Sequence, residues 1–236
     1  MTASTVATRL NNVRRQLADA LAAAHRPSTD ATLLAVSKTK PAEDIRAAYE
    51  AGQRAFGENY LQEALDKQAQ LASLDIEWHF IGPLQSNKTR EAATHFNWVH
   101  SIDRLKIAKR LNDQRPDALP PLNICLQVNI SRDPNKSGVL PEDAEAVVYE
   151  IIDLPRLCLR GLMTLPSASD AIEAQRRPFC ELRELRDRLQ QTFPQLALDT
   201  LSMGMSNDMN AAILEGATLV RIGTAIFGAR QYGAET

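Results

Sequence analysis

Residues 33–41 of the chain read LLAVSKTKP, an apolar run followed by polar residues that include no glycine. The apolar run has the length and composition of a β-strand that is covered on both faces. In a doubly wound open sheet, the first strand of this kind is followed by a glycine-rich turn. The missing glycine therefore favours the other common arrangement of parallel strands, a closed barrel, over the open sheet.

Further apolar runs follow this one, and longer amphipathic stretches separate them, as expected for a parallel α/β domain. We expect strands at Leu33–Ser37, Arg54–Gly57, Ile76–Ile81, Trp98–Ser101, Asn123–Ile130, Leu157–Thr164, Leu198–Met203 and Thr218–Ile222. We expect helices at about Thr5–Ala24, Ala42–Ala51, Tyr60–Ala72, Asn87–Thr94, Arg104–Asp113, Glu142–Ile152, Ala171–Phe193 and Asp208–Glu215. Eight strands alternating with helices close most naturally into a barrel. The sequence therefore predicts a single α/β domain over residues 1–236, a (β/α)8 barrel of the TIM type with an extra N-terminal helix.

The composition excludes several classes of protein. Apolar residues make up 44%, charged residues 24% and aromatic residues 5%, and the formal net charge is −2. No long basic run is present, so electrostatic capture of nucleic acid is not expected. The first 24 residues lack the apolar run of a signal peptide or membrane span. We expect a cytoplasmic chain with neither nucleic acid nor membrane as a partner.

The cysteines and histidines give no support for a disulfide framework or a metal site. The three cysteines form no C-x-x-C pair, and free thiols suit a reducing cytosol. The four histidines show no H-x-H or H-E-x-x-H spacing. We therefore expect no metal ligands in this chain.

Two residues follow the first and second expected strands, at the barrel end where reactive side chains gather. Lys38 would carry a partly desolvated amine that can attack an aldehyde, or it would be a solvated loop lysine like Lys40. Asn59 would orient a ligand oxygen, or it would cap the next helix. The residues alone leave both pairs of alternatives open.

The segments that follow the last two expected strands have the features of an anion site. They read SMGMSND at residues 202–208 and VRIGTAIFG at residues 220–228. Barrels frequently bind phosphate there, and Ser206 and Thr224 can donate hydroxyls while Gly223 lets the backbone approach an anion closely. Ordinary turn chemistry is the alternative. Arg221 lies within an apolar strand and needs a partner, either an ion pair or an acceptor on a ligand.

These segments, together with AVSK at residues 35–38, FGENY at 56–60 and WHFIGPLQSNK at 78–88, resemble the pyridoxal phosphate homeostasis proteins. The resemblance extends from about Leu33 to Arg230. It implies a barrel similar to the N-terminal domain of alanine racemases, with pyridoxal 5′-phosphate (PLP) held as a Schiff base on Lys38. It also implies roles for the other candidates: phosphate binding by Ser206, Gly223 and Thr224, contact with the pyridine nitrogen by Arg221, and a place beside the ring for Asn59.

The resemblance further implies a role in intracellular PLP homeostasis without robust catalysis, so we expect no catalytic residues. The chain departs from the racemase pattern at Ala42, where racemases carry a tyrosine, at Leu165, which replaces a histidine, and at Lys136, which replaces an arginine. We also expect no counterpart of the second racemase domain. A weak PLP-dependent racemase-like enzyme is the alternative, and a phosphosugar enzyme without PLP is a third hypothesis. As partners we expect PLP and PLP-dependent apoenzymes, and as oligomeric state a monomer or weak dimer.

Overall fold

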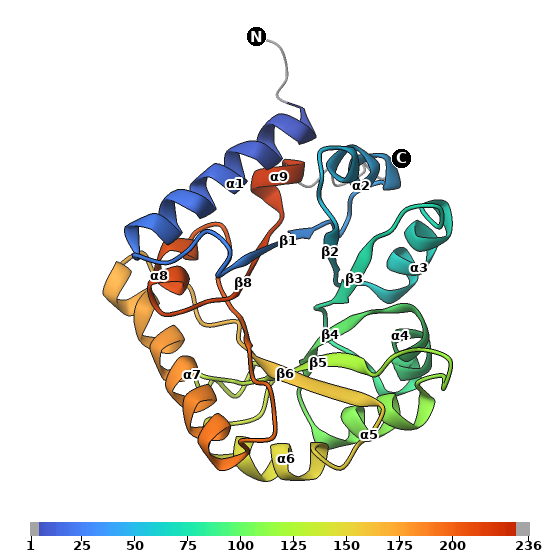
Figure 1. The fold of residues 1–236 in the computed structure, drawn as a ribbon, viewed down its shortest axis with the longest axis vertical. Helices are drawn as coiled ribbons and strands as arrows, with labels where there is room; N and C mark the ends of the chain where they lie inside the picture. Colours follow the sequence, from blue (N-terminus) through green and yellow to red (C-terminus); the bar gives the residue numbers. More distant parts are fainter. Residues whose placement is uncertain (1–4, 230–236) are drawn as a thin grey trace.

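The computed structural model describes residues 5–229, which form a closed barrel of parallel strands surrounded by helices (Figure 1). The strands are β1 (Thr32–Val36), β2 (Ala55–Glu58), β3 (Glu77–Phe80), β4 (Trp98–Ile102), β5 (Leu122–Gln127), β6 (Leu157–Met163), β7 (Thr200–Ser202) and β8 (Leu219–Ile222). Each expected strand is present and differs from its prediction only at its ends. The predicted fold class is therefore confirmed.

The barrel closes because the last strand pairs with the first. β8 lies parallel to β1, with Leu33 opposite Val220, and every other strand pairs with its neighbours in the sequence. Alternate residues of β1 explain its continuous apolar run: Leu33 and Ala35 pack in the main core against the helices, whereas Leu34 packs inside the barrel. A strand covered on both faces needs apolar residues at every position. The open sheet considered from the sequence is thereby excluded.

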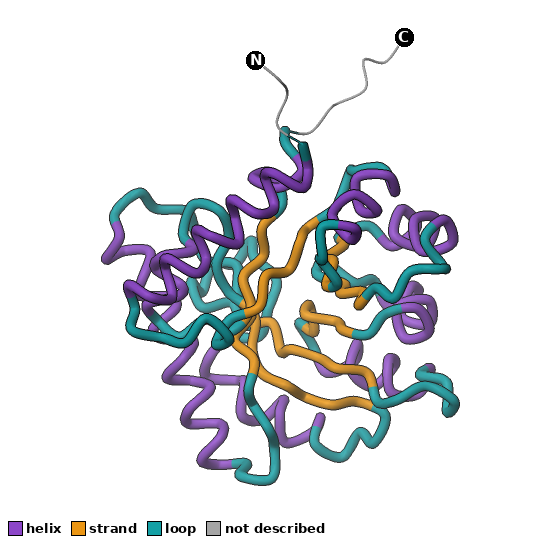
Figure 2. The backbone as a smooth tube through the Cα atoms, turned by 45° about the horizontal axis from the view of Figure 1, so that its top comes forward, coloured by secondary structure: helices purple, strands orange, loops and turns teal. Residues whose placement is uncertain are grey.

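The helices cover the outside of the strands, as the tube view shows (Figure 2). They are α1 (Val6–Ala23), α2 (Ala42–Glu50), α3 (Leu61–Gln70), α4 (Thr89–His95), α5 (Leu105–Gln114), α6 (Ala144–Ile151), α7 (Ile172–Thr192), α8 (Met209–Leu214) and α9 (Thr224–Phe227). Two short 3-10 helices, η1 (Ser86–Lys88) and η2 (Pro141–Asp143), precede α4 and α6. The sequence prediction merged each with its α-helix, and it missed α9 altogether.

The additional N-terminal helix α1 packs against the last helices of the chain. Its apolar face buries Leu10, Val13, Leu17 and Leu21, and it contacts α8 and α9. The Nε of Arg9 donates a hydrogen bond of 2.6 Å to the carbonyl of Ile226 in α9. The two ends of the described chain therefore meet on one side of the barrel (Figure 1).

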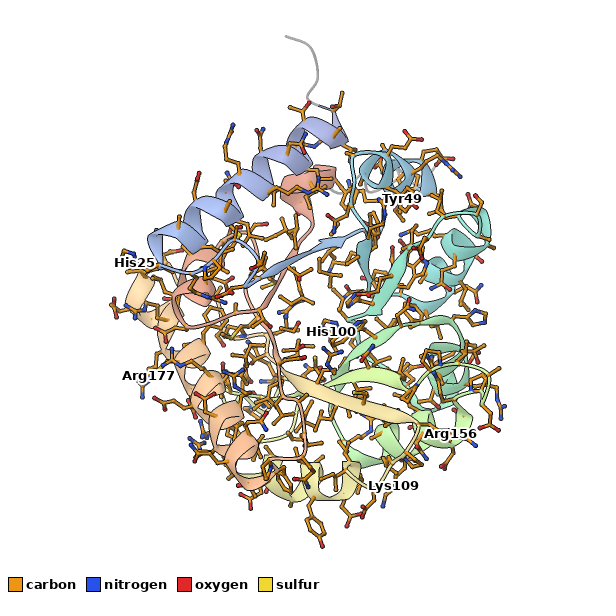
Figure 3. The ribbon with its side chains drawn as sticks, viewed as in Figure 1. His25, Tyr49, His100, Lys109, Arg156 and Arg177 are labelled. Carbon is orange, nitrogen blue, oxygen red and sulfur yellow. The ribbon has the colours of Figure 1, made fainter. Side chains whose placement is uncertain are left out.

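Polar side chains occupy part of the barrel interior. His79, His100 and Arg221 are buried there, beside a small apolar group formed by Trp98 and its neighbours. Figure 3 places His100 inside the ring of strands, whereas Lys109 and Arg177 lie on the outer rim. A buried polar group is tolerated only where it is hydrogen-bonded.

Among residues 5–229, no helix is both long enough and apolar enough to span a bilayer.

Candidate ligand site at the barrel mouth

The predicted site residues come from four adjacent strands. Lys38 follows β1, Asn59 follows β2, Ser206 follows β7, and Gly223 and Thr224 follow β8. The strand order is β7, β8, β1, β2, and all strands are parallel, so these residues lie at the same end of the barrel. Arg221 is the sixth candidate and lies one layer deeper, within β8. The structure therefore brings the six residues to one mouth, at the carboxyl ends of the strands.

The backbone on both sides of Lys38 is fixed by hydrogen bonds. On the preceding side, the Ser37 hydroxyl donates to Oε1 of Glu58 at 2.6 Å, and Nζ of Lys67 donates to the Ser37 carbonyl at 2.8 Å. On the following side, the amide of Thr39 donates to Oε1 of Glu63 at 2.6 Å. Thr39 has a φ of +62°, an unusual conformation for a β-branched residue. Such a conformation persists only where the surroundings hold it in place.

Lys67 of α3 joins these contacts into one cluster. Its ammonium pairs with Glu58 at 2.8 Å and also with Glu63. Burial raises the pKa of the Glu58 carboxyl, and the adjacent Lys67 counteracts that rise. We name the group Ser37, Glu58, Glu63 and Lys67 the lysine clamp, because it holds the turn that carries Lys38.

The lysine clamp is not among the sites predicted from the sequence. Its signals were present: Glu58 ends an otherwise apolar strand, and Lys67 follows Glu63 by one helical turn. Each signal is common by itself, because helices often carry Glu and Lys four residues apart. Only the fold shows that these residues meet beneath Lys38.

Asn59 does not cap the helix that follows it. The N-cap residue of α3 is Tyr60, and the helix has no side-chain cap. The Oδ1 atom of Asn59 is buried and has no hydrogen-bond partner in residues 5–229. Its neighbour Tyr60 is exposed. The capping alternative is therefore wrong, and the Oδ1 atom of Asn59 is left without a partner among the described residues.

The loops after β7 and β8 present donors to the mouth. Gly223 is the N-cap residue of α9, so the first amides of this short helix lack partners within it. The side chains of Ser206 and Thr224 belong to exposed residues. A Cβ atom added to Gly223 would lie 3.1 Å from the carbonyl oxygen of Val36, so β1 passes close to this turn. Glycine is therefore favoured here by packing against β1, in addition to any approach of an anion.

The β7 loop is held by Asp208. Asp208 precedes α8 as its N-cap residue, but its side chain makes no bond to the helix. Instead Oδ1 accepts a hydrogen bond of 2.6 Å from the amide of Met205. Asp208 thus fixes the turn that carries Ser206.

Arg221 is buried and has no ion pair among the described residues. Its Nη1 donates to Oγ of Ser202 at 2.8 Å, and its Nη2 donates to the carbonyl of Thr164 at 2.9 Å. Burial lowers the pKa of Arg221 to about 10. The structural ion pair considered from the sequence is therefore absent from this part of the chain. A guanidinium has five N–H groups, so these two bonds leave donors for a ligand acceptor.

Behind Arg221, hydrogen-bonded side chains continue through the barrel interior. Oγ of Ser202 lies 2.8 Å from Nδ1 of His100, and Nε2 of His100 lies 2.9 Å from Nδ1 of His79. Nε2 of His79 lies 2.7 Å from Oε1 of Glu77, at the opposite end of the barrel. No functional role is predicted for His79 or His100 from the sequence alone.

Acid should destabilise the fold through these two histidines. Burial lowers the pKa of both below the ordinary value of 6.5, and for His100 repulsion from Arg221, and from His79 once it is protonated, adds to this effect. The unfolded chain therefore takes up protons that the folded chain excludes, so stability is present above pH 6.5 and is lost as pH falls. Each buried histidine contributes a slope of at most about 1.4 kcal/mol per pH unit. Urea unfolding between about pH 5 and 7, the range in which histidines titrate, measures the dependence of the unfolding free energy on pH.

His100→Asn should show a shallower loss of stability than the wild type in this window. Glu77, His79 and Arg221 remain in the variant, so the difference reports His100. His95→Asn changes an exposed histidine and serves as the control. Equal slopes in the wild type and in His100→Asn would contradict a neutral buried His100.

The fold and the mouth define the class of protein: a ligand-binding (β/α)8 barrel with a lysine and hydrogen-bond donors suited to an anion around one opening. Residues 9–231 match the family model described as alanine racemase, N-terminal domain. The pyridoxal phosphate homeostasis protein of Pseudomonas aeruginosa is 58% identical over 231 residues, which are 98% of each chain. The protein of the same name from Escherichia coli K12 is 50% identical over 230 residues, 96% of this chain and 97% of that one. The chain therefore belongs to the alanine racemase N-terminal domain family and, within it, to the pyridoxal phosphate homeostasis proteins.

Solved structures agree with this assignment. PipY of Synechococcus elongatus with PLP bound has a TM-score of 0.84 at 40% identity, over 95% of this chain and all of that chain. The same protein without PLP has a TM-score of 0.86 at 43% identity. Alanine racemase from Corynebacterium glutamicum has a TM-score of 0.72 at 19% identity and is matched over 63% of its length, which shows a shared fold. Within residues 5–229, no group of three His, Cys, Asp or Glu side chains is placed to hold a metal ion.

Proposed function

We propose that this chain binds PLP at the mouth described above, as a Schiff base on Lys38, and takes part in PLP homeostasis. The observation that carries the proposal is the meeting of Lys38 with the β7 and β8 loops at one end of the barrel. Two supports come from relatives: the shared family name, and the PLP bound in PipY. The PLP-dependent apoenzymes of the cytoplasm are the partners that such a reservoir would supply.

The chemistry of the donor set fits each part of PLP. Lys38 supplies an amine for the aldehyde, and the α9 amides with Ser206 and Thr224 supply donors for the phosphate. The Oδ1 atom of Asn59 has no partner among the described residues and can accept a hydrogen bond from a ring substituent. Arg221 offers N–H donors beside the mouth for the pyridine nitrogen.

The residues around the mouth limit what bound PLP can do. PLP stabilises carbanions best when its ring nitrogen is protonated, usually by a carboxylate partner. Arg221 is a donor only, so it would keep that nitrogen unprotonated. Among residues 5–229, Arg221 donates to Ser202 and to the Thr164 carbonyl and forms no ion pair with a carboxylate.

Two polar side chains of the racemase site also lack counterparts in this chain. Ala42 is buried as the first residue of α2, and it has no proton to exchange. Leu165 is a partly exposed apolar side chain where racemases stack a histidine. General acid–base catalysis requires a titratable group within hydrogen-bond reach of the substrate. We therefore propose PLP binding without robust turnover, in preference to the weak racemase-like enzyme.

Borohydride reduction should fix a phosphopyridoxyl group on Lys38, because the reducing agent converts a Schiff base into a stable amine. The measurement is loss of the visible band together with peptide mapping by mass spectrometry. Lys38→Ala should lose the main labelled peptide, and Lys40→Ala, whose Nζ donates to the Ala229 carbonyl, is the matched control. Label found only on Lys40 or on Lys136, which donates to the Leu165 carbonyl, would overturn the assignment. An absence of any label in the wild type would favour the phosphosugar enzyme without PLP.

The PLP-loaded protein should not racemise alanine appreciably, because Ala42 has no ionisable side chain at the position where racemases carry a tyrosine. Incubation with L-alanine in deuterated water, followed by chiral chromatography and mass spectrometry, measures both inversion and α-deuteration. Ala42→Tyr restores the residue type that racemases carry and tests whether this position limits turnover. Steady deuteration by the wild type that disappears in Lys38→Ala would establish the enzyme alternative.

A further inference from the structure

The polar side chains inside the barrel form one continuous row from the ligand mouth to the opposite end. The row runs from Arg221 through Ser202, His100 and His79 to Glu77, with successive distances of 2.8, 2.8, 2.9 and 2.7 Å. The middle three side chains are buried, whereas the Glu77 side chain is 51% exposed. Glu77 lines a cavity of about 590 Å³ between α1 and the amino ends of β1 to β3. We name these five side chains the interior chain.

Hydrogen-bond chemistry leaves one direction for the protons of the interior chain. Arg221 can only donate, so Ser202 Oγ accepts from it and can give its own proton to Nδ1 of His100. His100 must then carry its proton on Nε2 and donate it to Nδ1 of His79. His79 in turn carries its proton on Nε2 and donates it to the Glu77 carboxylate.

The reverse direction would leave a buried proton without an acceptor. If Nδ1 of His100 donated to Ser202, the serine oxygen would accept two hydrogen bonds. Its own hydroxyl proton would then need a third partner, and the structure gives Ser202 Oγ only His100 and Arg221. An unsatisfied buried donor costs about 1 to 3 kcal/mol.

The charges around the interior chain agree with this direction. Burial lowers the pKa of both histidines, so they are neutral, as the direction requires. The hydrogen bond from His79 lowers the pKa of Glu77, with a further contribution from Arg160, so Glu77 is the anionic acceptor. Asp208 and Cys125 are the other ionisable groups that act on Arg221.

We propose that Ser202 and His100 are positioning residues for Arg221, and that the interior chain, ordered from Arg221 to Glu77, holds the guanidinium toward the ring of a ligand at the mouth. Ser202 and the Thr164 carbonyl fix two of its nitrogens. His100 fixes the rotation of the Ser202 hydroxyl, and the His79 ring is itself stacked on Trp98 at 5.3 Å. The part that concerns the ligand ring rests on the proposed function, whereas the order of hydrogen bonds in the interior chain does not.

The order can be measured without any ligand. In the full-length protein without PLP, ¹⁵N NMR of the histidine rings distinguishes the Nε2–H from the Nδ1–H tautomer. His79 and His100 should both be neutral Nε2–H tautomers, and His25→Gln and His95→Gln remove the signals of the two exposed histidines. An Nδ1–H tautomer or a charged ring at either buried position at neutral pH would overturn the proposed order. This outcome is independent of PLP binding.

The positioning role can be measured with two variants of one residue. The amide of Asn reaches about where Nδ1 of histidine lies, so His100→Asn can keep the bond to Ser202 and lose the bond to His79. The longer His100→Gln can keep the bond to His79 and lose the one to Ser202. We expect the visible band of bound PLP, and its dependence on pH, to stay near the wild type in His100→Asn. Arg221→Glu is the reference variant, because a carboxylate there would favour a protonated pyridine nitrogen and so alter the band. In His100→Gln the band should shift in the same direction as in Arg221→Glu, and the affinity for PLP should be several-fold weaker.

The remaining outcomes separate this proposal from simpler ones. Identical spectra and affinities in His100→Asn and His100→Gln, with both variants folded by circular dichroism, would show that His100 only fills space. If either variant fails to fold, Ser202→Ala replaces it, with Ser202→Thr as the conservative variant that restores a hydroxyl. Failure of the wild type itself to bind PLP would refute the proposed function while leaving the tautomer result intact.

Discussion

Pyridoxal, which lacks the phosphate of PLP, should bind at least about tenfold more weakly than PLP, because charge-assisted hydrogen bonds contribute about 1.5 to 3 kcal/mol each. The amides at the start of α9 and the hydroxyls of Ser206 and Thr224 would all lose their acceptor. Titration of the visible band with each compound measures the two affinities. Equal affinities would remove the phosphate site from the proposed function.

Variants in the loops after β7 and β8 should show how much each loop contributes to the preference for PLP over pyridoxal. Ser206→Ala removes one exposed hydroxyl and leaves the amides, so its loss of PLP affinity should be mild. Gly223→Val should be severe, because its Cβ would press on the Val36 carbonyl at 3.1 Å, two residues before Lys38, and its branches would cover the amides. Neither variant should change the affinity for pyridoxal as much as that for PLP. A Ser206→Ala loss larger than that of Gly223→Val would contradict an amide-based site.

Lys67→Met should destabilise the protein by about 3 to 5 kcal/mol, the cost of removing one partner from a buried ion pair. The variant leaves the Glu58 carboxylate buried beside Ser37 without its cation. It also frees the Ser37 carbonyl, so the turn that carries Lys38 should loosen and capture PLP less well. Chemical unfolding and PLP titration measure the two effects.

Two further variants make this result specific to the lysine clamp. Lys67→Met combined with Glu58→Gln removes the uncompensated charge and should recover much of the lost stability. Lys109→Met breaks an ion pair with Glu150 in which both side chains are about half exposed, and it should change stability very little. A Lys67→Met variant as stable as Lys109→Met would show that the lysine clamp does not hold the fold.

The fold could be predicted from the sequence because each strand is covered on both faces. Continuous apolar runs such as residues 33–36 then stand out from the amphipathic helices between them. Helix α9 was missed because its four residues follow a strand directly and have no amphipathic period to detect. The 3-10 turns before α4 and α6 were missed because their residues also suit the first turn of an α-helix.

The six candidate residues could be located because each follows a strand or, for Arg221, breaks an apolar run. The partners that fix them could not, since those partners depend on contacts between distant segments. Ser202 and His100 are 102 positions apart and meet only across the barrel interior. A sharper signal existed in the strands themselves. His79 lies between Trp78 and Phe80, and His100 follows Val99, so each interrupts apolar residues of a strand as an inward-facing polar residue would.

The closure of the first segments against the last ones has a consequence for synthesis on the ribosome. Arg9 and its acceptor Ile226 are 217 positions apart, and β1 pairs with β8 along one whole edge. At about 5 to 20 residues per second, α1 and β1 would emerge about 10 to 40 seconds before their partners exist. During that time the free edge of β1 and the apolar face of α1 are open to other chains. Nascent chains stalled before residue 219 should therefore depend on chaperones far more than chains released complete.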